Sequence, residues 1–257
     1  MKTFGQKKMV RKMNFICDQE GIMNRYLREQ KNWEGHLQNT KQFILNSFSD
    51  LKIKNLAILG SGWLLDLPLE ELSKKYNQIL LVDVHHPPQI VKKAESYKNI
   101  SLFETDLSGG GIKFCWDLRK AKEEHFSKYI LEDFTPHKPE LPVKSDAFVS
   151  LNLLNQLDIL LVDFLKKRNV RIVDTEIKKF RKIIQQFHLD WITKKPGCLI
   201  TDVREINQDE QEKTEQKLVN VDLPKAKRSE EWIWDFDLSK TYRPGLETRM
   251  KVQAIEW

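Results

Sequence analysis

The chain of 257 residues has few cysteines and no long apolar run. Its three cysteines, Cys17, Cys115 and Cys198, are far apart and odd in number. They form neither a disulfide framework nor a metal-binding spacing, which is typical of a reducing cytoplasm. No run of about 18 apolar residues could span a membrane, and no apolar segment of a signal peptide follows the basic start. We therefore expect a cytoplasmic protein without a membrane partner.

Composition and charge leave the class of partner open. Hydrophobic residues make up 40% of the chain and charged residues 31%, as in ordinary globular proteins. The net charge of +6 could mark a nucleic-acid surface. The simpler interpretation is a lysine-rich solvated surface, because 43 basic residues stand among 37 acidic ones. No nucleic-acid-binding motif favours the first interpretation.

The stretch 56–83 has the pattern of a βαβ unit built around a nucleotide-like ligand. A short apolar run ends in Gly60-Ser61-Gly62, and a second apolar run ends in Asp83. Buried parallel strands are apolar on both faces, and glycines let the backbone turn tightly and approach a ligand. The helix between the strands points its N-terminus at the ligand. The acid, 23 residues after Gly60, is placed for a ribose diol.

The residues before this unit predict helices. Met1–Met13 is basic and predicts a frayed leader. Asp18–Phe48 repeats apolar residues at helical spacing, and Gly35 predicts a kink. These helices either cap one end of the sheet or form a lid over the ligand. Both alternatives leave room for a substrate contact from Arg25 or Tyr26.

Strands and helices alternate through the rest of the chain. The predicted strands are Ile53–Leu59, Ile79–Val82, Ile100–Glu104, Ala147–Leu153 and Gly197–Val203. Trp232–Phe236 and Glu247–Trp257 predict a closing antiparallel hairpin. Predicted helices end at about Tyr76, Tyr97 and Lys167, and two more cover Phe114–Leu131 and Asp174–Ile192. The polar stretch 207–228 predicts an exposed insertion that is a lid, an RNA contact or a solvent-facing loop.

Polar residues follow several of these strands at the edge where open α/β sheets bind ligands. Asp106 follows the third strand, and Asn152 ends the fourth. His85 and His86 follow the second strand and could ligate a metal, but no Cys or carboxylate stands at ligand spacing. A loop at the rim of the ligand site is the simpler interpretation, and we predict no metal.

This order of elements resembles the class I S-adenosylmethionine-dependent methyltransferases, whose sheet has seven strands with the last one inserted antiparallel. The resemblance covers about residues 53–257. It implies an α/β fold with a doubly wound, mostly parallel seven-stranded sheet and a C-terminal antiparallel hairpin. We expect an N-terminal helical extension over residues 1–50 and a Rossmann-like methyltransferase domain over residues 51–257.

The resemblance also implies roles for the residues at the ligand edge. The turn Gly60–Gly62 would pass under the amino acid part of S-adenosylmethionine, and Asp83 would accept hydrogen bonds from the ribose. Asp106 would contact the adenine, and Asn152 would face the sulfonium and the acceptor. The implied cofactor-binding residues are Gly60, Ser61, Gly62, Asp83, Val84, Asp106, Leu107 and Asn152.

Two positions depart from the family pattern. Ile58 stands where the family usually has an acid, and Leu64 replaces the third glycine of the turn. Both changes are expected to weaken cofactor contacts. Asp66 either replaces the missing carboxylate or serves only as the N-cap of the helix that begins near Pro68.

The sequence does not name catalytic residues. Methyl transfer from a sulfonium mainly requires positioning of the acceptor, so no triad is expected. The segment 150–156 lacks the Asn/Asp-Pro-Pro-Tyr/Phe signature of enzymes that methylate planar amino groups, and Cys198 is expected to be buried. His85, His86 and His188 are candidate bases.

Three functions remain in competition. The first is a methyltransferase acting on a small molecule or on an RNA or protein acceptor. The second is a non-catalytic protein that binds an adenosine-like ligand, favoured by Ile58 and Leu64. The third is an NAD-dependent oxidoreductase, which Leu65 disfavours because it stands where the last glycine of Gly-x-Gly-x-x-Gly belongs.

Overall fold

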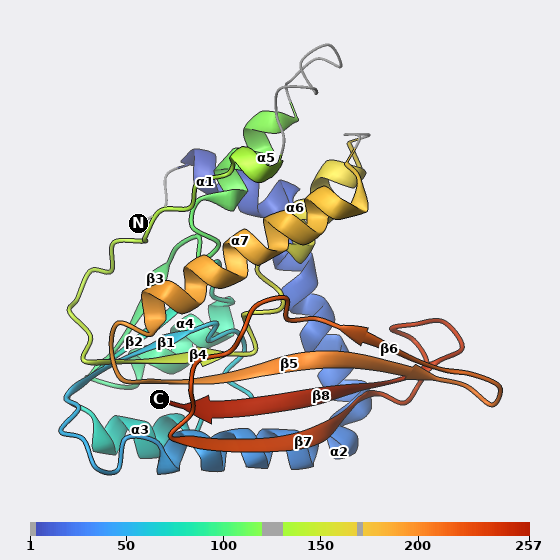
Figure 1. Ribbon diagram of the computed structural model, residues 1–257. Helices are drawn as coiled ribbons and strands as arrows, with labels where there is room; N and C mark the ends of the chain where they lie inside the picture. Colours follow the sequence, from blue (N-terminus) through green and yellow to red (C-terminus); the bar gives the residue numbers. More distant parts are fainter. Residues whose placement is uncertain (1–3, 120–130, 169–171) are drawn as a thin grey trace.

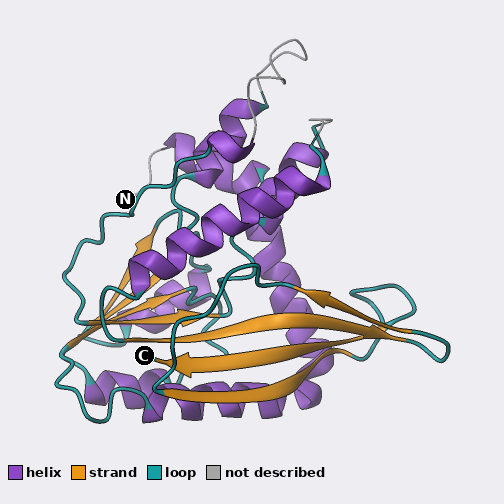
Figure 2. Ribbon diagram, viewed as in Figure 1, coloured by secondary structure: helices purple, strands orange, loops and turns teal. Residues whose placement is uncertain are grey.

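The computed structural model describes residues 4–119, 131–168 and 172–257, and it shows a sheet with helices on both faces (Figure 1; Figure 2). The strands are β1 (Asn55–Leu59), β2 (Gln78–Asp83), β3 (Ile100–Glu104), β4 (Ala147–Leu151), β5 (Gly197–Gln208), β6 (Lys213–Lys217), β7 (Arg228–Asp237) and β8 (Glu247–Glu256). The helices are α1 (Phe4–Lys12), α2 (Phe15–Asn46), α3 (Leu69–Lys75), α4 (Pro88–Glu95), α5 (Gly111–Leu118), α6 (Ile159–Lys166) and α7 (Asp174–Ile192).

The strand order is β3-β2-β1-β4-β5-β8-β7. The first five strands run parallel, and β8 lies antiparallel between β5 and β7. This confirms the doubly wound, mostly parallel sheet with a closing antiparallel hairpin. The sheet has eight strands rather than the predicted seven, because β6 pairs with the extended end of β5.

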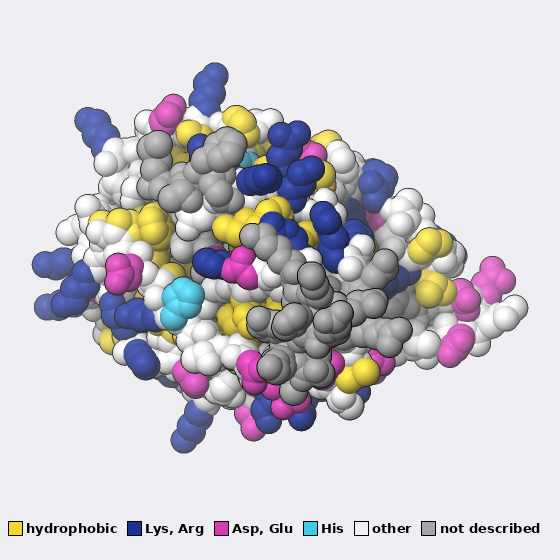
Figure 3. Space-filling view, turned by 90° about the horizontal axis from the view of Figure 1, so that it is seen from above, with side chains coloured by type: hydrophobic (Ala, Val, Ile, Leu, Met, Phe, Trp, Pro, Cys, Tyr) yellow, Lys and Arg dark blue, Asp and Glu magenta, His cyan; other side chains and the backbone are white. Residues whose placement is uncertain are grey.

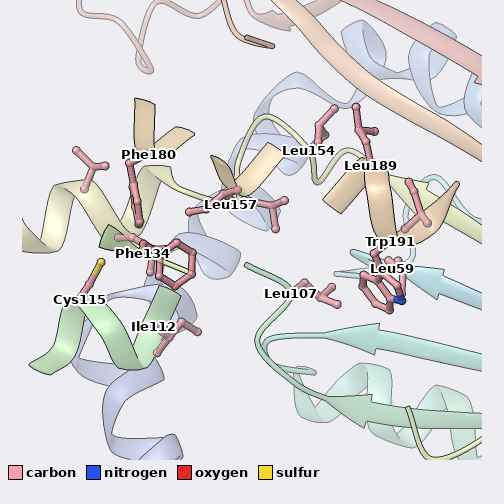
Figure 4. Packing of buried hydrophobic residues seen from close by; sticks show 14 of the residues in the cluster. Leu59, Leu107, Ile112, Cys115, Phe134, Leu154, Leu157, Phe180, Leu189 and Trp191 are labelled. Atoms are coloured by element: carbon pink, nitrogen blue, oxygen red, sulfur yellow. The ribbon is translucent and has the colours of Figure 1, made fainter. Parts of the chain in front are cut away.

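Each face of the sheet has its own hydrophobic core. On one face, α1, α5, α6 and α7 pack against β1, β4 and β5, and Figure 4 shows Cys115, Phe134 and Phe180 gathered between these helices. On the other face, α2 and α3 cover the sheet through residues such as Phe43 and Leu72. Burying one large apolar side chain contributes roughly 1.5–3 kcal/mol. Many buried apolar side chains therefore stabilise the packing of the helices on both faces of the sheet.

The N-terminal segment differs from its prediction. Met1–Met13 was expected to fray, but α1 forms over Phe4–Lys12, and Val10 and Met13 are 4% and 2% exposed in the core that contains β1 and β4. Their spacing of three places both side chains on one side of the helix. Residues 1–3 lie outside the described part of the chain. The packing of these two side chains, rather than the basic composition, therefore determines that the segment forms a helix.

The predicted kink at Gly35 is wrong. Helix α2 is continuous there, and its non-helical backbone is at Glu29, with φ −102° and ψ 16°. The Glu29 carboxylate is buried and accepts hydrogen bonds from the backbone N–H groups of Leu238 and Ser239, at 3.2 and 3.0 Å. A glycine inside a helix costs only about 1 kcal/mol relative to alanine, so packing along α2 keeps Gly35 helical.

Some other bounds differ from the predicted ones: β4 ends at Leu151 rather than Leu153, β5 extends to Gln208 rather than Val203, and β7 begins at Arg228 rather than Trp232. Helix α7 and strand β3 have the predicted ends. Helix α5 ends at Leu118, and the part of the predicted helix over 120–130, with Phe126 and Tyr129, lies outside the described residues. Part of the predicted insertion is strand β6. This strand has polar residues on both faces, so the sequence shows no apolar alternation that would predict it.

Candidate functional site

A cavity of about 300 Å³ lies at the carboxyl ends of the central strands. Its wall combines the loops after β1 to β4, strand β5, helix α2 and the β7–β8 hairpin. All eight predicted site residues line it: Gly60, Ser61, Gly62, Asp83, Val84, Asp106, Leu107 and Asn152. The fold therefore brings together residues that the sequence places on four separate strand ends.

The glycine turn has two different requirements. Gly60 has φ +82°, and a Cβ there would stand 2.6 Å from the carbonyl oxygen of Leu151, so only glycine fits between β1 and β4. Gly62 has φ +45°, and a Cβ there would meet nothing within 4 Å. The bare Cα of Gly62 therefore faces open space in the cavity wall.

The two departures from the family pattern lie behind this wall rather than in it. Ile58 is fully buried in β1, and Leu64 is 4% exposed in the same apolar core. Leu64 has φ +57°, a left-handed backbone that costs a non-glycine residue about 1–2 kcal/mol. Leu64 thus keeps the backbone conformation that a glycine would adopt, and packing of its side chain offsets the strain.

Asp83 is held at the cavity by backbone donors and by a side chain of α2. Its carboxylate accepts hydrogen bonds from the backbone N–H groups of Gly62 and Val84, at 2.8 and 2.7 Å, and from the Gln19 side chain at 3.1 Å. Burial raises the pKa of Asp83, although His86 and the backbone donors counteract it. Gln19, which sequence reasoning missed, reaches this carboxylate from α2, and its own Oε1 is buried without a hydrogen-bond partner among the residues that the structure describes.

Asp106 is committed to its own loop. Its carboxylate accepts hydrogen bonds from the backbone N–H groups of Ser108 and Ile112, at 2.8 and 2.9 Å, and from the Ser108 hydroxyl. It thereby fixes the turn before α5, where Gly109 and Gly110 have φ of +78° and +99°. The predicted adenine contact of Asp106 and Leu107 stays a prediction.

Asp66 does not cap a helix. Helix α3 begins at Leu69 after Pro68, with no capping side chain, so the N-cap interpretation of Asp66 is wrong. The Asp66 carboxylate lines the cavity and accepts a hydrogen bond from Asn152 Nδ2 at 2.9 Å. Burial raises the pKa of Asp66 to about 6. A carboxylate is therefore present in the loop that follows the carboxyl end of β1, eight residues after Ile58.

His36 is a second cavity residue that the sequence did not reveal. The indole N–H of Trp232 donates to His36 Nδ1 at 3.1 Å, so the ring proton of the neutral imidazole is on Nε2. That nitrogen lies 3.4 Å from the Asn152 amide. The ring stacks on Trp234 with centroids 3.9 Å apart, and burial lowers the pKa of His36 to about 3. His36 is therefore a neutral N–H donor at neutral pH.

Two carboxyl groups from β5 complete the polar wall. Asp202 and Glu205 are each 3% exposed and line the cavity. Glu205 accepts a hydrogen bond from Arg243 at 2.9 Å, whereas Asp202 has only a 3.5 Å contact from Asn155 to its Oδ2. Burial raises the pKa of Asp202 to about 7, and the charges of Asp66 and Glu205 add to this effect.

Aromatic residues of α2, β7 and the β7–β8 turn line the same cavity. This aromatic wall consists of Trp33, Trp234, Phe236 and Tyr242. The Arg25 guanidinium lies 4.5 Å from the Phe236 ring and 4.7 Å from the Tyr242 ring. Arg25 therefore reaches the cavity, as one of the two predicted substrate contacts.

The predicted base candidates do not line the cavity. His85 contacts Glu104 at 3.1 Å, and His86 contacts the Ser61 hydroxyl at 3.1 Å behind the glycine turn. His188 is fully buried against Ser150, and burial lowers its pKa to about 3. We therefore drop these histidines as bases.

Cys198 is fully buried as predicted, and burial raises the pKa of its thiol to about 12. Over 4–119, 131–168 and 172–257, no group of three or more His, Cys, Asp or Glu side chains could hold a metal ion. No helix in the same ranges is long and apolar enough to cross a membrane.

The strand order, with β8 inserted antiparallel, defines a Rossmann-like fold of the class I methyltransferase type. No protein-family model matches the chain, and no curated protein matches it. The N-methyltransferase NodS from Bradyrhizobium japonicum WM9, solved with S-adenosyl-l-homocysteine, is 12% identical over 85% of both chains, with a TM-score of 0.40.

Two other solved structures are similarly distant. A DhpI-SAM-HEP complex is 10% identical over 99% of both chains, with a TM-score of 0.36. The 23S rRNA methyltransferase ErmE is 10% identical over 87% of this chain and 68% of its own, with a TM-score of 0.31. Because these TM-scores are low, we base the fold on the strand order of the chain itself.

Proposed function

We propose that this chain binds S-adenosylmethionine and transfers its methyl group to a small-molecule acceptor. The observation that carries the proposal is the convergence of the glycine turn, Asp83, Asp106 and Asn152 on one cavity. These residue types and their places at the carboxyl ends of parallel strands are the ones expected for an adenosine-like ligand.

The residues present fit this ligand. The bare Cα of Gly62 leaves space for the amino acid part, and the Asp83 carboxylate stands at the end of β2, where a ribose diol is expected. Leu107 and Asp106 offer an apolar and a polar group for the adenine. When bound, S-adenosylmethionine supplies an electrophilic methyl group, and the chain has only to bind and orient the acceptor.

A small acceptor is favoured over RNA or protein by the size of the cavity. Helix α2 and the β7–β8 hairpin both contribute to the wall of this cavity of about 300 Å³, a volume within the range of small-ligand pockets. Figure 3 shows one face of the molecule, where Lys and Arg side chains are interspersed with Asp and Glu. On that face, Lys and Arg side chains lie in several places, among them a group above the centre of the picture.

A non-catalytic adenosine-binding protein is the second candidate. It is favoured by the contact of Gln19 with Asp83, because a ribose that pairs with this carboxylate has to displace or share the Gln19 amide. The Asp106 carboxylate is likewise occupied by its own loop. Both arrangements would lower the affinity for S-adenosylmethionine, which a methyltransferase has to bind again in every catalytic cycle.

Calorimetric titration with S-adenosylmethionine, S-adenosylhomocysteine and NAD tests the proposal. We expect micromolar binding of the first two and none of NAD. Release of S-adenosylhomocysteine in the presence of an acceptor separates the methyltransferase from the non-catalytic protein. If NAD binds and neither sulfur ligand does, the proposal is wrong.

A further inference from the structure

Among the carboxyl groups of the cavity wall, Asp202 has an oxygen that is buried without a partner in the described part of the chain. Its carboxyl is 3% exposed, and Oδ1 has no hydrogen-bond partner within the described chain. Oδ2 has only the 3.5 Å contact with the Asn155 amide. Buried carboxyl groups without partners are costly, so a side chain left in this state is expected to receive a donor from a ligand.

The surroundings of Asp202 select a positive donor. The charges of Asp66 and Glu205 act on it, and both are carboxyl groups. Glu205 is paired with Arg243, and Asp66 receives only the neutral Asn152 amide. Acidic side chains outnumber positively charged ones in the cavity wall. The acidic residues are Asp18, Asp66, Asp83, Asp106, Asp202 and Glu205, and the positively charged residue is Arg25. An anionic ligand group near Asp202 would be repelled.

The position of Asp202 is next to the end of β4. Leu151 of β4 pairs with Ile200 of β5, and the Asn152 backbone N–H donates to the Ile200 carbonyl at 2.9 Å. Asp202 follows Ile200 by two residues and lines the same cavity as Asn152. In the proposed function, this is the side of the cavity that receives the acceptor.

The aromatic wall indicates the rest of the acceptor. Trp33, Trp234 and Phe236 line the same cavity as Asp202. Aromatic faces bind apolar groups and attract cations. A ligand with one ammonium group on an aromatic or aliphatic body would bind Asp202 through its ammonium group and the aromatic wall through its body.

We propose that the acceptor is a small amine whose ammonium group binds Asp202 and transfers one proton to it. This inference rests on the proposed function, because it names the acceptor class of the same site. In the step, one N–H bond breaks, an O–H bond forms at Asp202 Oδ1, and nitrogen keeps the electron pair needed for methylation. Amines are protonated at neutral pH, so a base is needed here, and a base that titrates near 7 is suited to this work.

The test compares the wild type with Asp202→Asn and with the matched control Asp222→Asn, which changes an exposed acid outside the cavity wall. Each protein is first titrated with S-adenosylhomocysteine, then with matched pairs in its presence. The pairs are phenethylamine and 2-phenylethanol, and butylamine and 1-butanol. Calorimetry in phosphate and in Tris, whose ionisation enthalpies differ, also gives the protons released on binding.

We expect an amine to bind the wild type and the control, and its alcohol to bind about tenfold or more weakly. Asp202→Asn should lose about tenfold or more of the amine affinity and keep that for S-adenosylhomocysteine. The wild type should release about half a proton per amine at pH 7, since burial raises the pKa of Asp202 to about 7, and Asp202→Asn none.

The outcomes separate the two proposals. Equal binding of amine and alcohol, an Asp202→Asn variant that binds amine like the wild type, or no amine binding beside normal S-adenosylhomocysteine binding overturns the amine inference alone. Failure of the wild type to bind S-adenosylhomocysteine overturns the proposed function, and the amine inference with it.

Discussion

Replacing Asp202 by asparagine should stabilise the fold at neutral and basic pH. The side chain is almost fully buried, and burial raises its pKa to about 7 from the 3.8 of an unperturbed aspartate. One pKa unit is worth about 1.4 kcal/mol, so the ionised form costs the folded state about 4 kcal/mol. Asparagine has nearly the same shape and never ionises.

The sign follows from the two pKa values. As pH rises from about 4, the unfolded carboxyl loses its proton first, and wild-type stability falls until the folded carboxyl also ionises at about 7. The advantage of Asp202→Asn over the wild type should therefore grow between pH 4 and pH 7 and remain level above that. We expect it to be about 4 kcal/mol larger at pH 8 than at pH 4.

Urea denaturation of both proteins between pH 4 and pH 8 measures this difference, in which the titrating groups that do not interact with Asp202 cancel. Asp222→Asn, at an exposed position, should show a difference that is nearly constant with pH. A constant difference for Asp202→Asn as well would refute the reasoning, because it would mean that Asp202 ionises normally in the folded protein.

The cavity wall supports three further predictions. Gly60→Ala should lower the free energy of unfolding by roughly 2–4 kcal/mol, since its Cβ would press on the Leu151 carbonyl; an unchanged urea midpoint would argue against this. Gly62→Ala, whose Cβ meets open space, should lower the free energy of unfolding by only about 1 kcal/mol. Calorimetry should show that this variant binds S-adenosylhomocysteine about tenfold more weakly. A large loss of stability with unchanged binding would contradict this. Gln19→Ala should free Asp83 and tighten the same binding about fivefold; weaker binding would show that Gln19 itself holds the ligand.

The sequence predicted the parts of the site that local rules determine. Apolar runs gave the parallel strands, and Gly60, Asp83 and Asp106 were found because ligands bind where such strands end. The closing hairpin was also predicted, since its two strands alternate around a turn that contains Gly245.

The missed residues depend on contacts between distant segments. Gln19 meets Asp83 across 64 residues of sequence, and a polar residue on a helix looks solvent-exposed until its partner is known. His36 was missed for the same reason. Asp202 carried a usable signal, because it lies near the predicted end of the fifth strand, beside the strand β4 that Asn152 follows. For Asp66 the sequence left two roles open, because its distance from Pro68 also fits a helix start; its carboxylate accepts from Asn152 and caps no helix.

The affinity of S-adenosylhomocysteine for Asp83→Ala tests the central claim most directly. In the wild type, the carboxylate would accept from the ribose hydroxyls, and hydrogen bonds to a charged group contribute about 1.5–3 kcal/mol each. We predict that the variant, shown to be folded by its urea midpoint, binds at least about tenfold more weakly than the wild type. An unchanged affinity would contradict the account, because the ligand would then bind without the acid at the end of β2.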